Sequence, residues 1–168
     1  MSFAGPDGRY GMPTITPSLW FDGNAEEAAA FYVSVFPHST VDAAVRYTDA
    51  GPGPAGEVAY VTFTLDGQRF LGINGGPQFP FTEAVSFEVL CADQDEVDHY
   101  WNALVEGGAE SQCGWLADRF GLSWQIVPRR LYELLEDPDP ARAAAATAAM
   151  LEMRRIVVAD LEAAVTRV

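Results

Sequence analysis

Apolar and polar residues alternate along Ile15–Phe21, and this period of two predicts a strand with one mainly apolar face. Behind the strand, Asn24 and Glu27 have the spacing of a capping box, which predicts the start of a helix. Apolar positions at helical spacing continue from there until Pro37 ends the helix.

The rest of the first half predicts three more strands. Asp66-Gly67 has the composition of a tight hairpin turn, and the Gly/Pro-rich loop Asp49–Gly56 interrupts the pattern before it. The three strands are Val41–Tyr47, Val58–Leu65 and Arg69–Asn74.

After the linker Gly75–Thr82 the same order of elements is predicted again. Val85–Leu90 alternates as a strand, and Asp93 caps a helix that ends before Gly107-Gly108. Short strands are predicted at Glu110–Leu116 and Leu122–Val127.

The two halves form an internal repeat, which is the most informative feature of the chain. The helix caps Asn24 and Asp93 are separated by 93 − 24 = 69 positions, and the strand alternation matches at a shift of 68. One half alone has too few strands to bury its helix and also cover its other sheet face. We therefore expect an α+β fold in which two βαβββ modules pair into a partial barrel with a concave, ligand-binding face.

Beyond Pro128 the pattern is helical, with a short helix at Leu131–Leu135 and a longer Ala-rich one that begins at Asp139-Pro140. These helices are expected to cover either the barrel or a partner subunit, and their apolar residues are predicted to offer surface to a second copy. The residues concerned are Met150, Met153, Ile156 and Leu161. The predicted organisation is a flexible arm (1–13), a domain (14–128) made of modules 14–76 and 82–128, and a helical extension (129–168).

Composition narrows the classes of partner. The net charge is −14, and all ten basic residues are arginine. Such a charge disfavours binding to nucleic acid or to anionic membranes. It either keeps the protein soluble or attracts a cationic ligand. No apolar run reaches membrane-spanning length, residues 1–13 lack a signal-peptide layout, and Cys91 and Cys113 form no C-x-x-C pair. These features predict a cytoplasmic location.

Four segments of the chain carry a specific resemblance to one protein family. They are ITPSLWFDGNAEEAAAFYVSVFPHS, LDGQRFLGINGGPQF, AVSFEVLCADQDEVDHYWNALVEGG and CGWLADRFGLSWQIVP. They resemble the PhnB-like, or 3-demethylubiquinone-9 3-methyltransferase-like, branch of the vicinal-oxygen-chelate (glyoxalase/bleomycin-resistance/dioxygenase) superfamily. AMLEMRRIVVADLEAA also resembles the family's C-terminal segment. The resemblance implies paired βαβββ modules and a homodimer.

Metal-dependent members of the superfamily hold a divalent ion with His and Glu on the concave strands. Gln125 stands where those members carry an acid, seven residues after the turn residue Asp118. The positions that would carry His hold Thr16, Ser18, Ala84 and Ser86. Because these groups are weak ligands, and because His38 and His99 are both expected on the surface, we predict a metal-free site.

The methyltransferase label implies S-adenosylmethionine, which is usually held by a glycine-rich strand-to-helix turn in a parallel sheet. The Gly-rich stretches GPGPAG and NGGP are instead proline-punctuated loops between strands. The residues therefore predict no cofactor.

A polar and aromatic set remains on the expected concave face. Glu88 interrupts an apolar strand, so it is either a general base or counter-charge for a cationic ligand, or a solvent-facing residue. Cys113 is expected to be a packed or pocket-lining thiol rather than a nucleophile. The candidate ligand-binding residues are Trp20, Tyr60, Asn74, Ser86, Glu88, Cys113, Trp115 and Gln125.

Three functions fit these residues. The leading hypothesis is a metal-free protein that binds a small molecule. The alternatives are an enzyme of the same superfamily (a lyase, isomerase or dioxygenase) and an antibiotic-sequestering resistance protein. Whether a reaction is catalysed stays open at this point.

Overall fold

The computed structural model describes residues 15–168, so the predicted arm at 1–13 lies outside the described residues. The chain forms two compact units that divide between Phe79 and Pro80. The first unit holds the first module, and the second holds the other module together with the C-terminal helices. Each unit is described below by itself.

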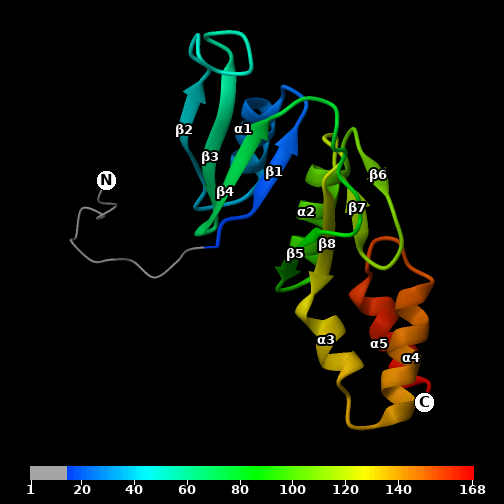
Figure 1. Ribbon diagram of the computed structural model, residues 1–168. Helices are drawn as coiled ribbons and strands as arrows, with labels where there is room; N and C mark the ends of the chain where they lie inside the picture. Colours follow the sequence, from blue (N-terminus) through cyan, green and yellow to red (C-terminus); the bar gives the residue numbers. More distant parts are fainter. Residues whose placement is uncertain (1–14) are drawn as a thin grey trace. The chain divides into compact units, whose positions relative to one another are not determined.

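The first unit is a four-stranded sheet with one helix (Figure 1). The strand order is β1-β4-β3-β2, in which β1 and β4 are parallel and the other pairs antiparallel. Tyr32, Val61 and Phe63 are fully buried between the helix and the sheet. The elements are β1 (Ser18–Phe21), α1 (Ala25–Val35), β2 (Thr40–Arg46), β3 (Val58–Leu65) and β4 (Gln68–Asn74).

The predicted hairpin turn is confirmed, and α1 begins directly after Asn24 as predicted, but the predicted side-chain cap is wrong. Asp66 and Gly67 both have positive φ, at 42° and 83°, as a two-residue turn of the type I′ family requires. The side chain of Asn24 makes no capping hydrogen bond. The first amide of α1, at Ala25, instead donates to Oδ1 of Asn74, at 2.9 Å.

The second unit repeats the sheet with the same topology, in the order β5-β8-β7-β6. Asp93 caps α2 as predicted, because its Oδ1 accepts from the Glu96 amide at 3.0 Å. The Glu96 carboxylate reaches back to the amide of Ala92. The elements are β5 (Ser86–Cys91), α2 (Gln94–Val105), β6 (Ala109–Glu110), β7 (Trp115–Ala117) and β8 (Ser123–Pro128). The prediction of an α+β fold with two βαβββ modules is confirmed.

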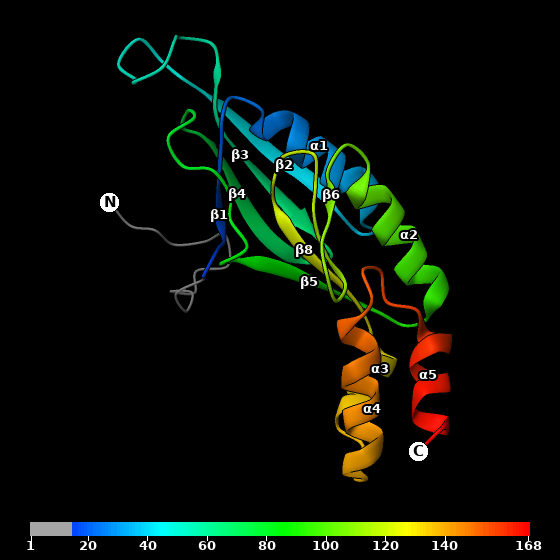
Figure 2. The same cartoon turned by 90° about the vertical axis from the view of Figure 1, so that its right-hand side faces the viewer.

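Three helices follow β8 and form a core of their own. They are α3 (Arg129–Leu135), α4 (Pro140–Leu151) and α5 (Val158–Thr166), and α4 and α5 lie side by side (Figure 2). Ile156 and Leu161 have no exposed surface, because they pack with Val127 of β8. The expectation that these two residues face a partner is therefore wrong.

Backbone and amide contacts join the C-terminal helices to the second module. The side-chain amide of Gln94, at the start of α2, donates to the Ile156 carbonyl and accepts from the Val158 amide. The amide of Cys113 donates to the Met153 carbonyl at 2.7 Å. The extension is thus part of the second unit rather than a loose tail.

None of the helices within residues 15–168 combines the length and the apolar character that a membrane crossing needs.

Candidate functional site

Each sheet has one face packed on its helix and one face opposite it, and six of the eight predicted site residues lie on the opposite faces, the exceptions being Asn74 and Cys113. In the first unit, Trp20, Ile73 and Tyr60 are paired in register across three strands. In the second unit, Glu88, Gln125 and Trp115 make the same row across β5, β8 and β7. The internal repeat therefore places Glu88 where the first module has Trp20, as the shift of 68 requires.

The row in the second unit is joined by side-chain hydrogen bonds. Gln125 donates from Nε2 to the hydroxyl of Ser86, at 2.8 Å, on the same face of the sheet. Glu88, which is exposed, accepts from the phenol of Tyr132 at 2.5 Å. Tyr132 lies on α3, and this hydrogen bond raises its pKa, because the protonated phenol is the form that donates to the carboxylate.

Cys113 does not join this row. It lies in the loop between β6 and β7 with a φ of 58°, and the next residue, Gly114, also has positive φ. A side chain on Gly114 would come within 2.8 Å of the Ile126 carbonyl oxygen, so the close approach of two backbones requires glycine. Cys113-Gly114, the first two residues of the segment CGWLADRFGLSWQIVP, thus allow this loop to pack closely.

The other thiol, that of Cys91, is buried and unreactive. Cys91 has no exposed surface, and burial, followed by the nearby Glu96 and Asp93, raises the pKa of its thiol to about 12. A thiol with so high a pKa stays protonated at neutral pH and is a poor nucleophile.

The D-x-F-G-x-x-W motif also has a structural explanation. Asp118 is 3% exposed, and its Oδ1 accepts from the amides of Phe120 and Leu122. Its Oδ2 accepts from the indole Nε1 of Trp124 at 2.8 Å. The carboxylate therefore holds the β7–β8 turn and the core tryptophan together, which leaves no free oxygen for a ligand.

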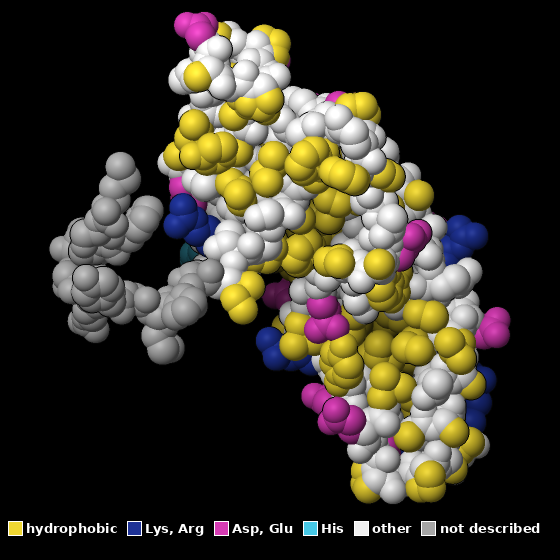
Figure 3. All heavy atoms as spheres, in the orientation of Figure 1, with side chains coloured by type: hydrophobic (Ala, Val, Ile, Leu, Met, Phe, Trp, Pro, Cys, Tyr) yellow, Lys and Arg dark blue, Asp and Glu magenta, His cyan; other side chains and the backbone are white. Residues whose placement is uncertain are grey.

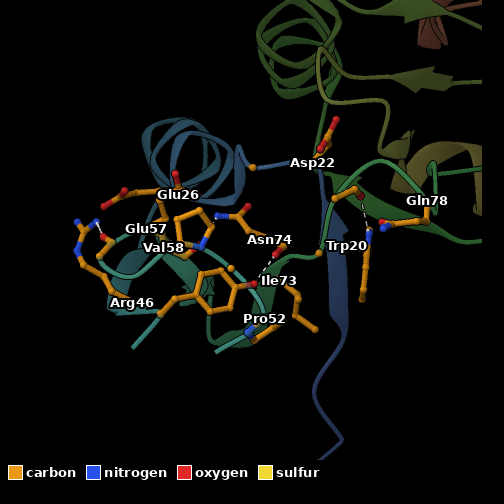
Figure 4. Close-up of a pocket in the computed structure, with 17 residues that line it drawn as sticks. Trp20, Asp22, Glu26, Arg46, Pro52, Glu57, Val58, Ile73, Asn74 and Gln78 are labelled. Atoms are coloured by element: carbon orange, nitrogen blue, oxygen red, sulfur yellow. Dashed lines mark hydrogen bonds between the residues drawn. The ribbon is translucent and has the colours of Figure 1, made fainter. Parts of the chain in front are cut away.

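A pocket of about 950 Å³ lies in the first unit, at the end of the sheet where β1, β2 and β4 finish (Figure 4). Trp20 and Gln78 stand on one side of it, and Arg46, Glu57 and Glu26 stand on the other. Its volume falls at the upper end of the range of small-molecule sites. The pocket contains two of the predicted site residues, Trp20 and Asn74; Tyr60 is 38% exposed on the neighbouring strand and does not line it.

The loop after β2 is wrapped around Tyr47 and forms one wall of the pocket. A Cβ on Gly53 would lie 2.4 Å from the ring of Tyr47, and one on Gly51 would lie 2.9 Å from it. Glycine at both positions lets the backbone lie flat on the ring. The phenol of Tyr47 in turn donates to the carbonyl of Asn74 at 2.9 Å, which ties the loop to the end of β4.

The opposite wall depends on the NGGP motif. A Cβ on Gly75 would lie 1.9 Å from the ring of Trp20, so the indole occupies the space that any other residue would fill. The indole Nε1 donates to the Gly76 carbonyl at 2.8 Å, and the ring meets Phe79 edge to face at 5.1 Å. Trp20 is thus held rigidly and presents a partly buried aromatic surface to the pocket.

Asn74 has a structural task at the base of the pocket. Its Oδ1 accepts from the first amide of α1, and its Nδ2 donates to the Val58 carbonyl at 2.9 Å. Both ends of the amide are therefore engaged within the fold. Sequence reasoning missed several lining residues, because the loop at 49–56 carried only a turn signal and Tyr47 only the signal of a strand end. These residues are Arg46, Tyr47, Pro52, Glu57 and Gln78.

The donor set does not fit a divalent metal. Of the positions expected to carry ligands, Ser86 and Gln125 hydrogen-bond to each other, and Ser18 and Thr16 offer neutral hydroxyls. Within residues 15–168, no three His, Cys, Asp or Glu side chains come together as a metal site would need. His38 and His99 both lie exposed, as expected.

Comparisons with known proteins agree with this architecture. The profile of the family described as 3-demethylubiquinone-9 3-methyltransferase matches residues 13–127. A solved structure from Bacillus cereus, described as a PhnB protein and provisionally as such a methyltransferase, is 38% identical. The match covers 69% of this chain and 99% of that one, with a TM-score of 0.63.

A second solved structure, a protein from Pseudomonas aeruginosa, is 23% identical with a TM-score of 0.58. The match covers 70% of this chain and 98% of that one, and at this identity it is evidence of the fold alone. No curated protein matches the sequence.

Two βαβββ modules of the same topology are the architecture of a protein of the vicinal-oxygen-chelate type. The chain belongs to the 3-demethylubiquinone-9 3-methyltransferase family, the PhnB-like branch of that superfamily. The family match ends at residue 127, so the three C-terminal helices lie outside it.

Proposed function

We propose that this protein binds a small organic molecule without a metal ion. The observation that carries the proposal is the pocket of about 950 Å³, whose wall is the rigidly held indole of Trp20. Ligand sites of this size typically combine an aromatic or apolar wall with a few polar groups. Here Arg46 and Glu57 supply charge, and Gln78 supplies an amide.

Native mass spectrometry of gently purified protein tests this proposal directly. We expect a co-purified organic molecule, and we expect Trp20→Ala to lower its occupancy at least tenfold, because lost burial of an aromatic contact is worth about 1.5–3 kcal/mol. Leu151→Ala, which removes an exposed apolar side chain far along the chain, is the matched control. Equal occupancy in wild type and Trp20→Ala would refute a site at this pocket.

The candidate row Ser86, Glu88, Gln125 and Trp115 belongs to the same proposal as a second group of contacts. Trp115→Ala reports whether this row takes part. Loss of occupancy in Trp20→Ala but not in Trp115→Ala would confine the ligand to the pocket.

We further propose that the protein does not use S-adenosylmethionine, in spite of the family's name. Each sheet contains a single parallel strand pair, and the Gly-rich stretches at 51–56 and 75–76 do not join a strand to a helix. That arrangement differs from the glycine-rich turn at which such nucleotide-like cofactors are usually held. Isothermal calorimetry is expected to show no saturable binding, and a micromolar dissociation constant would refute the proposal.

The metal-free part of the proposal is tested by elemental analysis. Protein purified without chelators is expected to carry far less than one zinc, nickel, manganese or iron per chain. Stoichiometric metal that survives dialysis and is lost in Gln125→Ala would instead support an enzyme of the superfamily.

A homodimer remains our expectation from the family resemblance. Apolar side chains gather over the C-terminal helices, flanked by acidic ones (Figure 3), and Leu151 is 57% exposed there. Met150 and Met153 are partly buried against the core of these helices. Light scattering at micromolar concentration tests the expectation, and a monomer would remove it.

Two free thiols suit a reducing compartment, so we also propose a cytoplasmic location.

A further inference from the structure

The face of the second sheet opposite α2 presents hydrogen-bond acceptors side by side. Glu88 and Gln125 are paired in register on neighbouring parallel strands, and such strands run about 4.8 Å apart. Because Gln125 donates from Nε2 to Ser86, its carbonyl oxygen is the atom left to face a ligand.

Tyr132 adds a donor from outside the family domain. Its phenol, on α3, donates to Oε2 of Glu88 at 2.5 Å. The bond restricts the Glu88 side chain to one orientation. Among residues 15–168, no arginine pairs with Glu88, so the second carboxylate oxygen is available.

We propose that Tyr132 is a positioning residue, which holds Glu88 so that Glu88 and Gln125 together bind an ammonium or guanidinium group of an organic ligand. The inference deepens the proposed small-molecule binding and rests on it. The chemistry follows from the atoms that face outward: two acceptor oxygens, one of them charged, match a cationic group with several N–H donors.

Two further features favour a cation over a neutral donor. Trp115 is paired in register with Gln125 on the strand next to β8, and an indole on that side of the amide suits the cation and its apolar neighbour. The net charge of −14 also raises the local concentration of cations around the protein.

The test uses n-butylguanidinium chloride as the probe and n-butylurea as its neutral counterpart, at constant ionic strength. Binding is followed by nuclear magnetic resonance at the side-chain amide of Gln125. We expect saturation by the guanidinium at millimolar concentration and no saturation by the urea. Glu88→Gln is expected to weaken the guanidinium at least tenfold, and Tyr132→Phe to weaken it about three- to tenfold.

Two control variants separate positioning from general effects. Tyr100→Phe removes a phenol from α2, which covers the other face of the same sheet, and is expected to leave probe binding unchanged. Glu106→Gln removes the same charge from an acid that pairs with Arg119, and it is also expected to have no effect.

A second readout reports the Tyr132–Glu88 contact without any probe. The phenol of Tyr132, assigned by Tyr132→Phe, is expected to titrate at lower pH in Glu88→Gln than in wild type, because a neutral amide stabilises the protonated phenol less than the carboxylate does. The resonance of Tyr60 is not expected to move between these proteins.

Three results would overturn the inference. Equal probe binding in wild type and Tyr132→Phe would remove the positioning role, and equal losses in Glu88→Gln and Glu106→Gln would mean attraction to the acidic surface alone. Absence of saturation would show that this row does not take such a cation. None of these results bears on the pocket in the first unit, which is tested separately by Trp20→Ala.

Discussion

Asn74→Ala offers the sharpest test of how the pocket is built. The asparagine lies 49 positions from Ala25, yet its Oδ1 caps α1, and its Nδ2 holds the Val58 carbonyl at the start of β3. Loss of a helix cap costs about 1 kcal/mol, and loss of a second part-buried hydrogen bond costs about 1 kcal/mol more. We therefore expect the free energy of unfolding of the first unit to fall by about 2 kcal/mol.

Native-state hydrogen exchange is the appropriate assay, because it reports the two units separately. The amides of Val61 and Phe63, in the core of the first sheet, should lose protection by about 30-fold, which is the ratio that corresponds to about 2 kcal/mol. Asn102→Ala, an exposed asparagine on α2, is the matched control and should change stability by less than about 0.5 kcal/mol.

Asn74→Asp separates the two hydrogen bonds. A carboxylate can still accept from the Ala25 amide, at a helix end that favours negative charge, but it cannot donate to Val58. We expect a loss smaller than that of Asn74→Ala. Protection in Asn74→Ala within about 0.5 kcal/mol of wild type would refute the capping role and would return Asn74 to the candidate ligand contacts.

Three further outcomes are expected. Asp118→Ala leaves three donors without their acceptor and should destabilise the second unit by about 3 kcal/mol in urea unfolding. A loss below about 1 kcal/mol would contradict the structural role of Asp118. The pKa of the Cys91 thiol is about 12 in the native state and near 9.0 in the unfolded chain, so stability should fall as pH rises between these values, and Cys91→Ala should reduce that slope. Gly75→Ala should displace the indole of Trp20 and cost about 1–3 kcal/mol, and an unchanged indole N–H resonance would contradict it.

Local patterns determined the secondary structure. The sequence predicted β3 with the bounds that the structure has, Val58–Leu65, and Asp66-Gly67 predicted its hairpin turn. The shift of 68 placed Trp20 and Glu88 in equivalent positions of the two sheets. These inferences succeeded because periodicity and turn chemistry act over a few neighbouring residues, so the sequence displays them directly.

The candidate site depended on contacts between distant residues. Tyr132 meets Glu88 across 44 positions, and the ring of Tyr47 becomes a pocket wall only when its hydroxyl reaches the Asn74 carbonyl, 27 positions away. Local spacing carries no signal of such pairs, because they form only when the sheet brings separate strand ends together. Ile156 is a further example: its apolar side chain could equally have faced a partner, and only the packing against Val127 placed it in the chain's own core.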